Sequence, residues 1–183
     1  MLVFVALAVV LTAIAAVTDT RSGRIPNWLT LGGVATAIVG HLGYGWVVVG
    51  AKFGLFQAVF AIAGALFCSI APAILFYKGG MGGGDLKLFA AVGALCHPML
   101  GIEAQLYSML IAAVIAPARL AYDGKLVSVL SRSLAVVFNP LRSREKRRAL
   151  PREALTWFRM GPAIFLGTLT VLVSNIFALL PPR

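Results

Sequence analysis

Acidic side chains are scarce in this sequence, which holds six Asp and Glu residues against sixteen Lys and Arg. Charged residues of both signs make up only 12% of the 183 positions and apolar residues 60%, a composition outside the range of soluble domains. No linker-like stretch separates two soluble cores. We therefore expect a single membrane-embedded domain over residues 1–183, with the bilayer as solvent for most of the chain.

Cysteine pairs and nucleotide-binding glycine motifs are also missing. Cys68 and Cys96 lie far apart inside apolar runs, so they form neither a CxxC pair nor a metal-ligating set. The glycine-rich stretch 79–89 contains no GxxxxGK[ST] or GxGxxG pattern, which argues against a phosphate-binding loop. The net charge of +10 comes without an aromatic-studded basic domain. We expect no metal, no cofactor and no nucleic-acid partner.

Long apolar runs dominate what is present. Residues 2–18 favour a retained first span over a cleaved signal peptide, because no basic segment precedes them and the next loop is itself basic. Further apolar runs, each near or above the roughly 17–20 residues that cross a bilayer, cover residues 28–51, 53–77, 88–118 and 161–180.

The run at 88–118 is long for one span and short for two. It is either one tilted helix or a hairpin of two short helices that turns near His97 to Glu103. The hairpin gives about six spans and leaves only Lys52 and Arg183 outside one strongly basic face. Because Lys and Arg mark cytoplasmic loops, we expect an all-α polytopic membrane helix bundle with its N-terminus outside.

A basic loop at about 119–160 falls on the predicted cytoplasmic face. Within it, residues 126–138 have apolar side chains at helical spacing and favour an amphipathic helix on the inner leaflet. The run Arg142–Arg148 indicates a solvated, lipid-facing segment, with attraction of an acidic partner as the alternative.

Two of the rare acidic residues fall at cytoplasmic helix ends: Asp19 closes the first span and Asp85 opens the fourth. Carboxylates at a membrane edge are costly and are candidates for function. Two carboxyl groups that share one proton can cleave a peptide, because the ionised group activates water while the protonated one polarises the carbonyl. Gly82, Gly83 and Gly84 would give a substrate backbone room to approach, and a merely flexible loop is the alternative.

These residues carry a resemblance to a known family. GGGD at residues 82–85 matches the GxGD motif of membrane aspartyl proteases, and GGGDLKL resembles its form in type IV prepilin leader peptidases. DTRSGRIPN, residues 19–27, resembles the D-x5-I-P-N segment of that family. The resemblance implies Asp19 and Asp85 as the catalytic pair.

The family cleaves the basic leaders of type IV prepilins and pseudopilins at the cytoplasmic face of the bacterial inner membrane. By this resemblance, the partners expected here are such a substrate, membrane lipids and pilus-assembly proteins. Lys87 either contributes to the electrostatics of the site or extends to the lipid headgroups. Pro26 and Asn27 are expected to shape the turn and to cap the second helix.

One departure narrows the resemblance. The bifunctional members carry a cytoplasmic insertion with paired CxxC motifs, and no such insertion follows residue 27. Leader cleavage carries over, whereas zinc binding and methyl transfer to the new N-terminus do not. The short chain is similar to the Tad/CpaA-type enzymes that serve Flp-type pili, and less similar to archaeal preflagellin peptidases.

Two other classes of function stay open. A small ion or solute carrier could use Asp19 and Asp85 as a cation site, although carriers place such groups near the bilayer midplane. A non-catalytic scaffold for pilus assembly could instead dock a partner through its basic loop. His41, His97 and Glu103 fall toward the outer face, where ordinary interfacial placement is expected.

Overall fold

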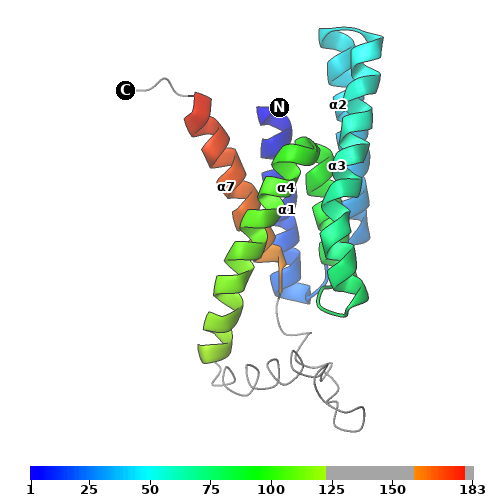
Figure 1. Ribbon diagram of the computed structural model, residues 1–183. Coiled ribbons are helices and arrows are strands. Elements are labelled where there is room, and N and C mark those ends of the chain that lie inside the picture. Colours follow the sequence, from blue (N-terminus) through cyan, green and yellow to red (C-terminus); the bar gives the residue numbers. More distant parts are fainter. Residues whose placement is uncertain (123–158, 180–183) are drawn as a thin grey trace, which may run out of the picture. The chain divides into compact units, whose positions relative to one another are not determined.

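The computed structural model describes residues 1–122 and 159–179, and all the regular secondary structure within those ranges is helical. The helices are α1 (Leu2–Ser22), α2 (Asn27–Val48), α3 (Ala51–Tyr77), α4 (Gly83–Tyr122) and α7 (Gly161–Leu179) (Figure 1).

The chain divides into two compact units, Met1–Ile111 with Arg159–Arg183, and Ala112–Phe158. The first unit contains both aspartates, the whole of α1 and the start of α4.

Five helices in the described part of the chain are long and apolar enough to cross a membrane. Their outward faces carry large apolar side chains, such as Val39 on α2 and Val59 on α3, which are 67% and 60% exposed. Such faces suit a hydrocarbon solvent. The all-α polytopic bundle is confirmed, while the count of six spans and the outside position of the N-terminus stay predictions.

The helices approach one another closely at small residues. A Cβ placed on Gly45 of α2 would lie 2.8 Å from the Cα of Gly54 of α3. These helices are joined by a tight turn at Gly50, whose φ of 130° suits glycine alone. Glycine at a crossing lets two backbones pack without an intervening side chain, as in many membrane helix pairs.

Helix α4 is broken at His97, whose φ of 63° and ψ of 171° are not helical. A Cβ placed on Gly101 would lie 2.8 Å from the Cα of Gly93. A straight helix would hold these residues about 12 Å apart. The chain therefore doubles back at His97, as the green ribbon in Figure 1 shows, within the stretch where the hairpin was predicted.

The expected interfacial placement of His41 is wrong, because this side chain is fully buried. Its Nε2 lies 3.0 Å from the carbonyl oxygen of Leu95. Its ring stacks on Phe4, at a centroid distance of 3.7 Å, and packs against His97 at 4.1 Å. The two histidines thus help to join α1, α2 and α4.

Helix α7 packs along α1 and against the second arm of α4, the part that follows the reversal at His97. A Cβ placed on Gly167 would lie 2.5 Å from the backbone nitrogen of Ser108 on α4. At the other contact, a Cβ on Gly161 would lie 3.2 Å from the Cα of Ala16 on α1. This packing brings the start of α7 to the last turns of α1.

Three expectations fall outside the described residues. They are the amphipathic helix at 126–138, the basic run Arg142–Arg148 and most of the basic loop at 119–160.

Candidate active site

Asp19 is a buried carboxylate near the C-terminal end of α1, with 6% of its surface exposed. The helix ends four residues later at Gly23, whose left-handed φ of 66° allows its N–H to donate to the carbonyl oxygen of Asp19. The side chain is held separately, because the backbone N–H of Gly161 donates to Oδ2 of Asp19 over 3.0 Å. The carboxylate is therefore fixed between α1 and the start of α7.

The contact between Asp19 and Gly161 leaves no room for a side chain. A Cβ placed on Gly161 would lie 2.9 Å from both Cβ and Oδ2 of Asp19. The glycine therefore allows the N-terminal end of α7 to approach the carboxylate directly. A helix N-terminus carries partial positive charge and free N–H groups, which suit an anionic partner.

Asp85 lies in the first turn of α4 and is partly buried. Its Oδ2 lies 3.0 Å from the position that a Cβ on Gly82 would occupy. The preceding residue, Gly84, lies against Ile25 of the loop that follows α1, so Asp85 lies at the same end of the first unit as Asp19. The structure thus brings together the two acidic residues that the sequence placed at one face.

The glycine-rich segment before Asp85 reaches α4 through a turn at Gly79, whose φ is 76°. Gly82 is exposed beside the Asp85 carboxyl group. Gly83 faces the ring of Phe76, and a Cβ on Gly84 would lie 3.2 Å from the Cβ of Ile25. Gly84 therefore lets the α1–α2 loop pack on the start of α4, which brings the two sequence motifs into contact.

Lys87 is exposed and donates a hydrogen bond from Nζ to Oδ1 of Asn27 over 2.9 Å. Pro26 and Asn27 were expected to shape the turn and cap α2; Pro26 occupies the N-cap position and Asn27 begins the helix, but no side chain makes a capping hydrogen bond there. The side chain of Asn27 accepts the hydrogen bond from Lys87 instead. This bond links the start of α2 to the start of α4.

Sequence reasoning missed the residues that precede and open α7. The guanidinium of Arg159 donates to the backbone carbonyl of Thr20, and Gly161 donates to Asp19. The available signal was the pair Gly161-Pro162 at the start of the last apolar run, since proline is favoured in a first helical turn and glycine permits close approach. Nothing in the sequence indicates that Gly161 contacts Asp19.

No group of three or more His, Cys, Asp or Glu side chains that could hold a metal ion occurs in residues 1–122 and 159–179. The site consists of two carboxyl groups, a backbone N–H donor and an exposed glycine at one end of the first unit. This arrangement defines the class of the protein: a polytopic helical membrane protein with two carboxyl groups at helix ends in its candidate site.

Comparison with known families identifies that class more closely. The model of the type IV leader peptidase family matches residues 5–117, more than half of the chain. The protein belongs to this family, and peptidase activity follows from that membership. The match contains Asp19 and Asp85 but ends before Gly161. No curated protein and no solved structure matches the chain.

Proposed function

We propose that this protein is an aspartic endopeptidase that removes the basic leader of type IV, Flp-like prepilins or pseudopilins. The cut is made at the cytoplasmic face of the bacterial inner membrane. The observation that carries the proposal is that Asp19 and Asp85 lie at the ends of separate apolar helices, which the contact of Gly84 with Ile25 holds together. Membership in the leader peptidase family supports the substrate class.

The hydrogen bonds suggest how the two carboxyl groups divide the work. The N–H of Gly161 is a donor, so Oδ2 of Asp19 acts as an acceptor, as an ionised carboxylate does. We therefore assign Asp19 as the group that removes a proton from water. Asp85 is then the protonated partner that donates a hydrogen bond to the scissile carbonyl oxygen.

The reaction follows from these roles. Water loses a proton to Asp19 as its oxygen bonds to the carbonyl carbon of the junction, and Asp85 stabilises the negative charge that develops on the carbonyl oxygen. The tetrahedral intermediate then collapses, the C–N bond breaks, and the proton on Asp19 passes to the leaving amine. The exposed backbone at Gly82 leaves the Asp85 side of the site open to an extended chain.

The location of the site fits a substrate that is itself anchored in the bilayer. Asp19 and Asp85 lie at helix ends, so a membrane-spanning substrate can keep its apolar helix in lipid while its leader junction reaches them. A site at the bilayer midplane, as in a carrier, would require unwinding of the substrate helix at much greater depth.

The test is co-expression with a prepilin and measurement of its size. Asp19→Asn and Asp85→Asn should each lower the cleavage rate by about 10²- to 10⁴-fold, the range that general acid–base groups supply. Glu103→Gln is the matched control, since Glu103 is a partly buried acid beyond the reversal of α4, and it should cleave normally. Normal cleavage by either aspartate variant would overturn the assignment, and ion flux in liposomes that both variants abolish would favour a carrier.

A further inference from the structure

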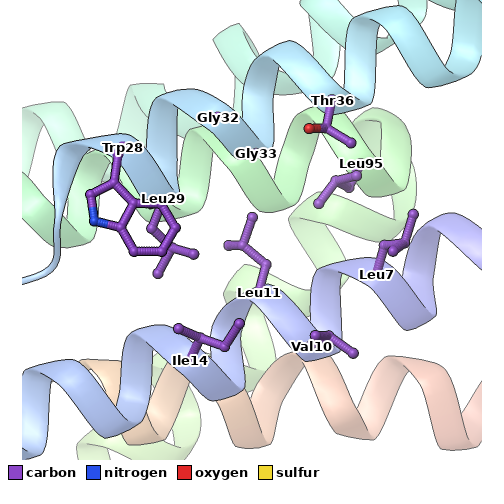
Figure 2. A pocket seen from close by; sticks show the side chains of 10 residues that line it. All are labelled: Leu7, Val10, Leu11, Ile14, Trp28, Leu29, Gly32, Gly33, Thr36 and Leu95. Carbon is purple, nitrogen blue, oxygen red and sulfur yellow. The ribbon is translucent and has the colours of Figure 1, made fainter.

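A groove runs between α1 and α2 and encloses about 310 Å³. Figure 2 shows its walls, with Leu11 of α1 and Leu29 of α2 pointing toward each other across it. The groove is open on one side, where Val10 is 56% exposed and Trp28 is 71% exposed. Both walls belong to membrane-spanning segments, so the opening faces lipid in the membrane.

The lining is almost wholly apolar. Among its residues only Thr36 and the indole of Trp28 carry a polar side-chain atom. Such a surface offers no set of polar contacts that would orient a charged or strongly polar ligand, so its occupant is hydrocarbon-like. Two candidates have this chemistry in a membrane: a lipid chain and an apolar helix.

A glycine in the groove wall favours an apolar helix over a lipid chain as the occupant. A Cβ placed on Gly32 would meet no atom within 4 Å, so this glycine is not required by packing within the protein. The neighbouring Gly33 differs, because its Cβ would clash with the side chain of Leu11. A bare backbone facing an open groove lets another helix approach closely, whereas a flexible lipid chain needs no such surface.

The groove also leads to the proposed active site. Ile14 and Trp28 line it at the end next to the α1–α2 loop. Ile14 stands about 7.5 Å before Asp19 along α1. Trp28 directly follows Asn27, which holds Lys87 on α4. A helix in the groove therefore directs one of its ends to the carboxyl groups.

We propose that this groove binds the apolar helix that follows the leader in the substrate, and so sets the position of the scissile bond. The proposal rests on the proposed function, because the substrate must be cut at the N-terminal end of such a helix. Between Leu7 and Ile14 the α1 wall covers about 10 Å, or two helical turns. Contact over this length supplies binding energy remote from the reacting bond.

A substitution that fills the groove tests the proposal. Gly32→Leu should project into the open space and hinder entry of the substrate helix. Gly43→Leu is the matched control, since Gly43 also lies exposed on α2 and its Cβ would also meet nothing within 4 Å. Both changes replace a helical glycine by a better helix former, so neither should impair folding.

The measurement is the cleavage of a membrane-spanning prepilin by reconstituted enzyme at varied substrate concentration. Gly32→Leu should raise KM about tenfold with little change in kcat, the pattern of lost ground-state binding, while Gly43→Leu matches the wild type. If wild-type enzyme cleaves the substrate and Gly32→Leu has the KM of Gly43→Leu, the groove is not the binding site. If the wild type cleaves no prepilin, the proposed function itself fails.

A crosslinking experiment gives an independent readout. A photoreactive amino acid at Val10 in the groove is compared with the same group at Val59, on the outer face of α3 and similarly exposed. In an Asp85→Asn background that retains uncut substrate, Val10 should crosslink to the prepilin helix and Val59 should not. Crosslinks from Val10 to lipid alone, or equal capture at both positions, would overturn the proposal.

Discussion

Gly161→Ala is the substitution that most directly perturbs the environment of Asp19. The added methyl carbon would lie 2.9 Å from Cβ and Oδ2 of Asp19 and 3.2 Å from the Cα of Ala16. Optimal carbon contacts begin near 3.5 Å, so the start of α7 or the carboxylate must move by about 0.6 Å. Overpacking of this kind typically costs about 1–3 kcal/mol of folding free energy.

The effect on catalysis should exceed the effect on stability. A displacement of about 1 Å at a catalytic group can lower the rate about a hundredfold, so a shift of this size should lower kcat by roughly ten- to a hundredfold. The assay is single-turnover cleavage of a prepilin by purified enzyme, with the rate divided by the fraction that remains folded. A melting curve on the same samples gives that fraction.

Gly167→Ala separates a general defect in α7 from a local one at Asp19. Its new Cβ would lie 2.5 Å from the backbone nitrogen of Ser108, on the second arm of α4. This variant overpacks the same helix away from the carboxyl groups. It should lower Tm yet keep kcat per folded molecule. If Gly161→Ala keeps kcat within about twofold of the wild type, or if Gly167→Ala loses as much, the reasoning about the Gly161–Asp19 contact is refuted.

Two further predictions concern the bond between Lys87 and Asn27 and the glycine beside the Asp85 carboxyl group. Lys87→Met and Asn27→Ala should each lower kcat/KM by roughly fivefold, which corresponds to about 1 kcal/mol of transition-state stabilisation. The double variant should lose no more kcat/KM than the worse single variant. Additive losses in this double-mutant cycle would show that the hydrogen bond between the two side chains does not cause the single-variant losses. Gly82→Ala should lower kcat by about tenfold, because its Cβ would lie 3.0 Å from Oδ2 of Asp85. Gly80→Ala, whose Cβ would have an ordinary contact at 3.5 Å, is its control in the same cleavage assay, and equal kcat for the two would count against crowding of the carboxyl group.

Much of the helix pattern can be predicted from the sequence, because apolar runs bounded by charge, glycine and proline depend on local composition. The runs at 2–18, 28–51 and 53–77 lie in or nearly coincide with α1, α2 and α3. The turn near His97 was also predictable, since the run that contains it is too long for one span. The close approach of Gly93 and Gly101 depends on tertiary packing and has no local signal.

The site was predictable only in part. Asp19 and Asp85 stand out because ionisable residues are rare and costly at the edge of an apolar span. The interaction of Lys87 with Asn27 could not be predicted from spacing, since it depends on how the first turns of α2 and α4 pack against each other. The burial of His41 was missed because the sequence around a lone histidine in an apolar run does not indicate that the rings of Phe4 and His97 will pack on it.

The hydrogen bond from Gly161 to Asp19 joins residues 142 positions apart in the chain. During synthesis, at about 5–20 residues per second, the donor emerges on the order of ten seconds after its acceptor. A nascent chain that has inserted α1 to α4 already contains both aspartates, yet it lacks the N–H that fixes one of them. The proposed site therefore reaches its final form only after α7 has entered the membrane, so the onset of activity depends on the insertion of that helix.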